Sequence, residues 1–287
     1  MSPATVFERI GALRSWLEAH RVAGRRIGLV PTMGYLHAGH ASLIRRARQE
    51  CDIVVVSVFV NPTQFGPGED YDRYPRDLEH DQALCEAEGA DAIFAPPVVE
   101  MYPTGAPCTR VTVARVSEGL CGRSRPHHFA GVATVVTKLL NIVQPHRAYF
   151  GEKDYQQLAV IRTMVADLNL PVDIVGCPTV RESDGLAMSS RNSYLSPELR
   201  ARAPAIYRAL CAGRDAAQAG ERSAGAIAAR VKAALEPVPD AAVEYVEVVD
   251  AESLAPLQEV GGGAVIAVAV RLGGTRLIDN IAIKPVP

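Results

Sequence analysis

The chain of 287 residues is long enough for one large domain or two ordinary ones, each with a substantial buried core. Hydrophobic residues make up 48% of it and charged residues 22%, a balance typical of a folded globular protein and not of a disordered one. Its 30 basic residues oppose 32 acidic ones, so it lacks the basic excess that proteins bound to nucleic-acid backbones usually carry. We therefore expect no nucleic-acid partner.

The sequence also argues against a membrane or secreted protein. No apolar run approaches the roughly 18 residues that a membrane span requires. The N-terminus has no basic segment followed by an apolar core, so we expect no secretory signal and no membrane partner. The six cysteines include no Cys-x-x-Cys pair, which is typical of reduced thiols and not of a disulfide framework or zinc site. These features predict a cytoplasmic protein.

Strand-like and helix-like segments alternate through the first 180 residues. Strand-like runs, apolar and mostly short, occupy residues 27–30, 53–60, 92–95, 148–150 and 172–177. Helical patterns occupy residues 37–50, 77–88, 132–143 and 155–168. The alternation predicts an α/β fold, with a Rossmann-like parallel sheet forming a catalytic domain over residues 1–180.

The pattern changes after about residue 180. Two alanine-rich helical stretches cover residues 203–219 and 223–235. Three strand-like runs without intervening helices follow at 243–249, 264–271 and 276–283, with glycine clusters that supply turns. This order predicts a smaller α+β C-terminal domain with an antiparallel sheet over residues 181–287.

The most informative segment joins the first predicted strand to the next helix, and it reads PTMGYLHAGH over residues 31–40. A helix start offers N–H groups and partial positive charge, which suits a polyphosphate. His37 and His40 are three residues apart and share one face of the helix, so both imidazoles can reach one ligand. Gly39 between them permits a close backbone approach.

This string resembles the His-x-Gly-His signature of a superfamily that contains nucleotidyltransferases and class I aminoacyl-tRNA synthetases. Those enzymes attack the α-phosphate of ATP and expel pyrophosphate. A second signature of that superfamily closes on the phosphates, and the segment MSSR at 188–191 stands at the matching place. Its two hydroxyls and guanidinium can bind phosphate oxygens and stabilise charge on the leaving pyrophosphate.

Three further blocks narrow the resemblance to one family. FVNPTQF at 59–65 and GEKDYQQ at 151–157 each lie at the carboxyl end of a predicted strand, where ligands bind in open α/β sheets. Together with DGLA at 184–187, they are similar to the pantothenate synthetases, or pantoate–β-alanine ligases, over residues 26–196. The resemblance implies condensation of (R)-pantoate with β-alanine to pantothenate. It also implies a pantoyl-adenylate intermediate and the release of AMP and pyrophosphate.

The resemblance implies roles for particular side chains. His40, His37, Lys153 and Arg191 are expected to be catalytic by offsetting charge on the triphosphate. No general base is needed for the first step, because a carboxylate with a pKa near ~4 is ionised at pH 7. The residues expected to bind ATP are Met33, Gly34, Tyr35, Leu36, His37, Ala38, Gly39, His40, Gly151, Glu152, Lys153, Asp154, Val180, Met188, Ser189, Ser190 and Arg191.

The substrates, metal and assembly are also implied by the resemblance. Gln64, Gln157 and Asn61 are expected to bind pantoate and β-alanine, because amides both donate to and accept from oxygen groups. Mg²⁺ is expected with ATP, and Asp81 is the residue predicted to contact it. The resemblance also implies a homodimer. The C-terminal domain is expected to act as a lid, because the MSSR loop lies at the domain boundary.

Several alternatives remain at this stage. Another adenylyltransferase of the superfamily is the nearest, although the blocks at 59–65 and 151–157 count against it. An aminoacyl-tRNA synthetase would need an anticodon domain, and an inactive nucleotide-binding regulator would not need the four catalytic residues intact. The base that deprotonates β-alanine is left open. His127 and His128 are interpreted as ordinary loop histidines, at a point where family members often have Gly-His.

Overall fold

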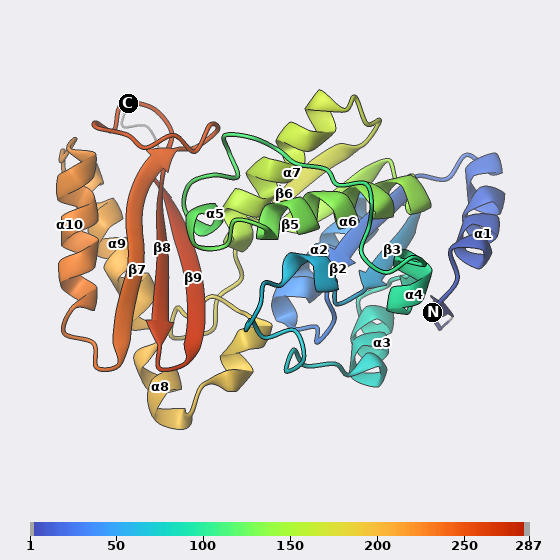
Figure 1. Ribbon diagram of the computed structural model, residues 1–287, viewed down its shortest axis with the longest axis horizontal. Helices are drawn as coiled ribbons and strands as arrows, with labels where there is room; N and C mark the ends of the chain where they lie inside the picture. The colour runs from blue at the N-terminus through green and yellow to red at the C-terminus, as the bar shows by residue number, and fades with distance from the viewer. Residues whose placement is uncertain (1–2, 284–287) are drawn as a thin grey trace. The chain divides into compact units, whose positions relative to one another are not determined.

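The computed structural model describes residues 3–283, and these residues form two compact units (Figure 1). Unit 1 contains residues 3–114, 125–152 and 160–178. Unit 2 contains residues 115–124, 153–159 and 179–283. Each unit has its own sheet and its own hydrophobic core.

Unit 1 is built on a six-stranded sheet in the order β1-β4-β3-β2-β5-β6, in which every paired strand runs parallel to its neighbour. The strands are β1 (Thr5–Phe7), β2 (Ile27–Thr32), β3 (Ile53–Val58), β4 (Ala92–Phe94), β5 (Arg147–Gly151) and β6 (Asp173–Cys177). This order confirms the predicted α/β fold with a Rossmann-like parallel sheet. The chain runs outward from β2 to β3 and β4, and later forms β5 on the other side of β2. Ligands bind such sheets at this reversal, outside the carboxyl ends of the strands.

Helices flank the sheet of unit 1 (Figure 1). They are α1 (Ile10–Val22), α2 (Ala38–Glu50), α3 (Leu78–Ala87), α4 (Val98–Met101), α6 (His128–Val143) and the later part of α7 (Tyr155–Asp167). Helix α2 buries Ile44 and Ala47 completely, in one core cluster with Val30 of β2 and Val54 of β3. Because these apolar residues recur at helical spacing, α2 presents one apolar face to the sheet.

Some element boundaries differ from the sequence prediction. Strand β2 continues through Pro31, because its pairing with β3 extends to Thr32 although its pairing with β5 stops at Leu29. Helix α6 begins at His128, before the predicted start at Val132, even though glycine at 131 disfavours a helix. Strand β1 and helix α1 were not predicted. Strand β1 is only partly buried, so it lacks the continuous apolar run that indicated the equally short β4.

Unit 2 contains a three-stranded antiparallel sheet in the order β7-β8-β9, as predicted for the C-terminal part of the chain. Its strands are β7 (Ala241–Asp250), β8 (Ala264–Leu272) and β9 (Thr275–Ile283). Its helices are α5 (Cys121–Ser124), α8 (Pro197–Arg202), α9 (Ala205–Gln218) and α10 (Ala224–Leu235), besides the first turn of α7. None of the helices within residues 3–283 is long and apolar enough to cross a membrane.

The core of unit 2 depends on a close approach of α9 to α10 and to the central strand. Gly213 of α9 is glycine for this reason, since a Cβ there would lie 2.5 Å from Val231 Cγ2 and 2.9 Å from Ile266 Cδ1. Ile266, in the middle of β8, is completely buried. The strand β8 is therefore the centre of this core.

We expect Ile266→Ala to lower the free energy of unfolding by about 2–5 kcal/mol, because it removes most of a fully buried side chain and leaves a cavity. Urea denaturation followed by circular dichroism measures the change. Val22→Ala is the control, since Val22 of α1 is 81% exposed, and it should change the free energy by less than about 0.5 kcal/mol. Equal effects of the two substitutions would contradict the placement of Ile266 in the core.

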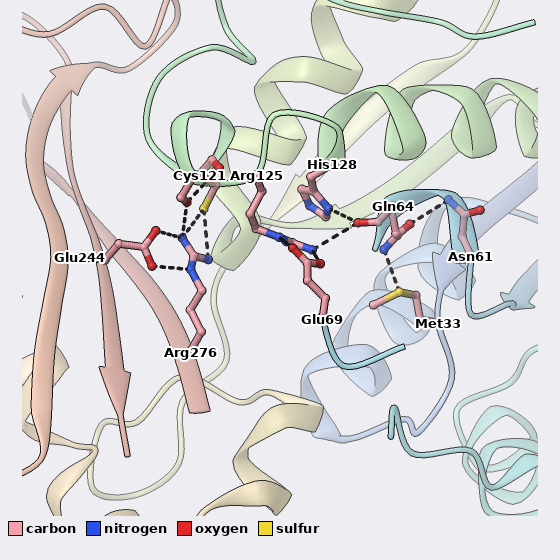
Figure 2. Close-up of polar contacts among 10 residues, drawn as sticks. Met33, Asn61, Gln64, Glu69, Cys121, Arg125, His128, Glu244 and Arg276 are labelled. Atoms are coloured by element: carbon pink, nitrogen blue, oxygen red, sulfur yellow. Dashed lines mark hydrogen bonds and ion pairs between the residues drawn. The ribbon is translucent and has the colours of Figure 1, made fainter. Parts of the chain in front are cut away.

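A second stabilising feature of unit 2 is an ion pair between its outer strands (Figure 2). Arg276 of β9 donates from Nε to Glu244 Oε2 at 2.8 Å and from Nη2 to Oε1 at 3.0 Å. The same guanidinium lies 3.5–3.6 Å from Cys121 Sγ. The hydrogen bond from Arg276 lowers the pKa of Glu244 to about 2, although burial opposes the shift.

This ion pair predicts a loss of stability in acid. Because the pKa of Glu244 is lowered in the folded state, its contribution is complete above the ordinary value of 4.5 and disappears as the pH falls toward 2. Relative to a protonated Glu244, the ionised carboxylate gains at most about 3 kcal/mol, an amount that screening by solvent reduces. Urea midpoints between pH 6 and pH 3 should therefore fall less in Glu244→Gln than in the original chain. The exposed Glu259→Gln is the control, and a slope like that control's in Glu244→Gln would contradict the assignment.

Candidate active site

The loop after β2 is held by a buried carboxylate. Asp81 of α3, which is 1% exposed, accepts the N–H of Tyr35 at 2.9 Å and the N–H of Leu36 at 2.6 Å. Gly34 turns the chain with φ of +82°, and a Cβ there would lie 2.9 Å from both Asp81 Oδ2 and Val58 Cγ1. Only glycine fits this turn. The loop that leads into His37 thus has a defined path.

His37 and His40 form reciprocal caps at the start of α2. The N–H of Gly39 donates to His37 Nδ1 at 3.1 Å, and the N–H of His37 donates to His40 Nδ1 at 3.3 Å. The ring centroids are 4.1 Å apart. A ring nitrogen that accepts a hydrogen bond carries no proton, so in this arrangement both rings carry a proton on Nε2. Two N–H donors beside a helix N-terminus suit phosphate oxygens.

Asn61 belongs to a buried hydrogen-bond network and contacts the side chain of Gln64 (Figure 2). Its Nδ2 donates to Gln64 Oε1 at 3.1 Å and to Gly131 O at 3.2 Å. Its Oδ1 accepts from the hydroxyl of Tyr102 at 2.9 Å and from the hydroxyl of Thr63 at 3.0 Å. Asn61 is 1% exposed and Gln64 is 8% exposed. This network brings two predicted substrate-binding residues together and turns Asn61 inward.

A magnesium site at Asp81 does not agree with these contacts. Both of its carboxylate oxygens accept backbone N–H groups. Burial raises the pKa of Asp81 above its ordinary value, although those N–H groups act to lower it. Within residues 3–283, no group of three or more His, Cys, Asp or Glu side chains could hold a metal ion. The buried carboxylate of Asp81, bonded to the main chain through both oxygens, therefore does not fit the predicted magnesium contact, and Asp81 instead fastens the loop.

The carboxyl ends of β2 and β5 lie beside each other in unit 1, because Leu29 pairs with Ala148 in parallel register. The loop that carries His37 leaves β2 at this edge, and the predicted ATP-binding residue Gly151 ends β5 there, followed directly by Glu152. This edge is the topological switch point, where an open α/β sheet binds its ligand.

Unit 2 holds the other predicted phosphate-binding residues on a braced loop. The N–H of Met188 donates to Val180 O at 3.0 Å, and Arg181 pairs with Ala187 in an antiparallel bridge. Ser189 caps the short 3₁₀ helix η3 (Ser190–Tyr194) by accepting the N–H of Arg191 at 3.3 Å. The Ser189 hydroxyl therefore shapes the start of the short helix that carries Ser190 and Arg191.

Ionic contacts brace that loop within unit 2. The Arg181 guanidinium donates to the carboxylate of Asp279 on β9 at 2.6 and 3.0 Å and lies 3.7 Å from the ring centroid of Tyr207. Arg200 of α8 donates to Asp184 at 2.7 Å and also to Glu182. Because both guanidinium groups bind rigid elements to the loop, the position of residues 180–191 follows from the fold of unit 2.

Lys153 and Asp154 directly precede α7, and Gln157 lies in its first turn. All three residues belong to unit 2. Lys153 Nζ lies 3.8 Å from Asp154 Oδ2, and the Lys153 side chain is 19% exposed. Its main-chain carbonyl accepts from Asn280 Nδ2 at 2.9 Å, which fastens this turn to β9. Gln157 is half-buried. The neighbouring Gln156 is buried, and its amide donates to the carbonyls of residues 116 and 119.

Comparison with known proteins identifies the family. Residues 5–282 match the family model described as pantoate-beta-alanine ligase. The chain is 54% identical over 279 residues to the pantothenate synthetase of Moorella thermoacetica, covering 97% of this chain and 98% of that one. The chain belongs to the pantoate–β-alanine ligase family. It is an enzyme that condenses pantoate with β-alanine, and the family resemblance predicted from the sequence is confirmed.

Similar proteins and solved structures agree with this membership. The pantothenate synthetase of Aquifex aeolicus is 56% identical over 276 residues, covering 96% of this chain and 97% of that one. The crystal structure of pantothenate synthetase from Thermus thermophilus matches with a TM-score of 0.93 and 52% identity, covering 98% of this chain and all of that one. A pantoate-beta-alanine ligase from Francisella tularensis, complexed with beta-gamma ATP and beta-alanine, matches with a TM-score of 0.81 and 34% identity, covering 97% of each chain.

Sequence reasoning missed the side chains that brace the ligase's loops. Arg181 and Asp279 are 98 residues apart and meet only in the folded unit. The two partners of Asp81 are main-chain N–H groups, which carry no signal in side-chain identity. The sequence does carry one signal for this loop. A glycine between Met33 and Tyr35 predicts a tight turn, and a tight turn needs a hydrogen-bond partner for its main chain; Gly34 indeed has a positive φ.

We expect Asp81→Asn to lower kcat by about tenfold while the fold is retained, because the amide NH₂ replaces one of the two oxygens that accept from the loop. Steady-state formation of pantothenate measures kcat, and circular dichroism monitors the fold.

Two comparisons separate the loop role of Asp81 from a metal role. Glu79→Gln, an exposed carboxyl change on the same helix, should leave kcat within about twofold of the original. Excess magnesium should not restore the activity of Asp81→Asn. Recovery at high magnesium would show that Asp81 contacts the metal and would overturn its assignment to the loop.

Proposed function

We propose that the enzyme makes pantothenate in two steps at one site. In the first step a carboxylate oxygen of (R)-pantoate attacks the α-phosphorus of ATP, the bond to the β-phosphate oxygen breaks, and pyrophosphate leaves. In the second step the amine of β-alanine attacks the acyl carbon of the pantoyl adenylate, loses a proton, and expels AMP. The reciprocal His37–His40 caps at the start of α2 carry this proposal, because they place two N–H donors at the switch point of the sheet.

ATP and β-alanine as substrates are supported by the family relative from Francisella tularensis. Its structure, complexed with beta-gamma ATP and beta-alanine, resembles this chain over 97% of its length. The enzyme accordingly uses ATP to drive the condensation. Magnesium enters as the salt of ATP, bound by phosphate oxygens and water, since Mg²⁺ commonly keeps several waters.

Charge governs the first step, because two anions must meet. His40 and His37 donate to the triphosphate, with His40 the stronger candidate for the transition state. Lys153 and Arg191 offset the charge that develops on pyrophosphate. The other contacts to ATP come from Met33, Gly34, Tyr35, Leu36, Ala38, Gly39, Gly151, Glu152, Asp154, Val180, Met188, Ser189 and Ser190.

Gln64 and Gln157 bind the hydroxyl and carboxylate oxygens of pantoate, and Gln64 also lies near β-alanine in this proposal. Neutral amides hold the carboxylate and leave it reactive. An arginine would bind the carboxylate more strongly and make it less nucleophilic. Asn61 has a different role from the predicted one. Because it is 1% exposed and bonded through both ends of its amide, it orients Gln64 and does not itself touch substrate.

The proposal also covers the location, the oligomeric state and the domain roles of the enzyme. We propose that the enzyme is a cytoplasmic homodimer, in agreement with the family resemblance and with cysteines that form no disulfide pattern in the sequence. Unit 1 supplies most of the catalytic domain predicted over residues 1–180, and unit 2, which also includes residues 115–124 and 153–159, acts as a lid over the nucleotide. The braced loop at 180–191 supports the lid role, because a phosphate-binding loop must keep its shape to close on a ligand.

Exchange of radioactive pyrophosphate into ATP tests the two-step reaction. Purified protein with magnesium and (R)-pantoate, without β-alanine, should catalyse exchange that disappears when pantoate is omitted, because only a reversible adenylate links the two. His40→Ala should remain folded and lose exchange by at least about 100-fold, the scale of one preorganised donor to a developing anion.

Two results would contradict the proposal. If no exchange occurs, adding β-alanine decides whether it must bind before adenylation, since AMP release would then follow. If a folded protein that binds ATP shows neither pyrophosphate exchange nor AMP release, the adenylate route is overturned. Near-original exchange by His40→Ala would remove His40 from the mechanism.

A further inference from the structure

Two side chains of unit 1 converge on the main-chain carbonyl of Gln64 (Figure 2). His128 Nδ1 lies 2.9 Å from this oxygen, and Arg125 Nη2 lies 3.3 Å from it. A carbonyl oxygen only accepts hydrogen bonds, so both groups donate and His128 carries a proton on Nδ1. The donors come from the start of α6 and from the segment just before it.

The same guanidinium also binds a carboxylate on the far side of the loop. Arg125 Nε donates to Glu69 Oε1 at 2.7 Å, and Nη2 donates to Oε2. The Arg125 side chain is 15% exposed and the Glu69 side chain 25% exposed. Burial acts to raise the pKa of Glu69, but the hydrogen bond and charge of Arg125 outweigh it and hold the pKa below its ordinary value. The guanidinium therefore joins both ends of the segment 64–69.

The side chain of Gln64 depends on the position of this main chain. Gln64 Oε1 accepts from Asn61, and Gln64 Nε2 lies 2.9 Å from Met33 Sδ. On the opposite side, Gly131 of α6 approaches so closely that a Cβ there would lie 2.3 Å from Thr63 O. With so little space around the segment, a small displacement of the carbonyl would turn the amide away from its partners.

A buried ion pair adds little net stability, because the cost of removing two charges from water offsets their attraction. Its clearer effect is geometric, since a bidentate guanidinium accepts only a narrow range of partner positions. The contacts of Arg125 to one carbonyl and one carboxylate thus restrain the segment 64–69 more than they stabilise the unit.

We propose that Arg125, Glu69 and His128 form a clamp that positions Gln64 to bind pantoate. The clamp rests on the proposed contact between Gln64 and pantoate and adds three positioning residues to it. His128 is therefore not the ordinary loop histidine expected from the sequence. The adjacent His127 is exposed and has no part in the clamp.

Steady-state kinetics of clamp variants test the inference. His128→Ala removes one donor and should raise the KM for pantoate about fivefold to tenfold, with the KM for ATP within about twofold of the original. His128→Asn keeps an amide N–H close to the position of Nδ1 and should recover most of the loss. Arg125→Gln should raise the KM for pantoate further, about 10- to 100-fold, because it also leaves the Glu69 carboxylate without its counter-charge.

Two reference variants make the result specific. His127→Ala changes the neighbouring histidine and should leave both KM values within about twofold. Gln64→Ala removes the amide that the clamp positions, and in that background His128→Ala should add no further increase. Thermal unfolding of every variant checks that the enzyme remains folded under the assay conditions.

The remaining outcomes would overturn either the clamp alone or the clamp together with the proposed role of Gln64. Parallel increases in the KM for ATP and pantoate, failure of His128→Asn to recover, or additive effects with Gln64→Ala would make the cluster structural and overturn the clamp. A raised KM for pantoate in Gln64→Ala, with none in Arg125→Gln and His128→Ala, would overturn the clamp alone. An unchanged KM in Gln64→Ala would overturn the proposed role of Gln64 and the clamp together.

Discussion

The parallel pairing of β2 with β3 on one side and β5 on the other is the constraint on which unit 1 depends. It requires a strand buried on both faces, and Ile27, Leu29 and Val30 are completely buried. It also requires close packing at Gly28, where a Cβ would lie 2.9 Å from Cys51 Sγ. Because the chain departs to opposite sides of β2, the loops after β2 and β5 meet at one edge. The histidine pair of the ligase is placed there by the sheet and not by the loop alone.

Buried polar side chains then convert this edge into a defined site. Asp81 holds the loop after β2, Asn61 orients the amide of Gln64, and the pair of Arg125 with Glu69 restrains the segment that carries it. Each of these groups is bonded within the protein, as a polar group removed from water must be. Such networks add modest stability but strongly restrict geometry. That restriction suits a reaction whose difficulty is the approach of a carboxylate to a triphosphate.

In unit 2, side-chain hydrogen bonds likewise restrain the loop at residues 180–191. Here the anchors are Arg181 bound to Asp279 and Arg200 bound to Glu182 and Asp184. Asp279 lies on β9, which belongs to an antiparallel sheet with its own core around β8. A segment rich in hydroxyls and carrying a guanidinium would otherwise sample many conformations. Its fixed shape follows from the sheet that it is bonded to, as the shape of the histidine loop follows from unit 1.

The sequence by itself determined the alternation of strands and helices, because buried parallel strands need continuous apolar runs and helices need a recurring apolar face. It also determined the His37–His40 arrangement, since capping of a helix start depends on residues only three positions apart. The motifs sufficed to predict the family. Only the tertiary structure decided that Asp81 fastens a loop and that Arg125 and His128 hold the carbonyl of Gln64. Those contacts join groups 45 to 64 residues apart, and a local pattern carries no information about which distant donor will meet which acceptor.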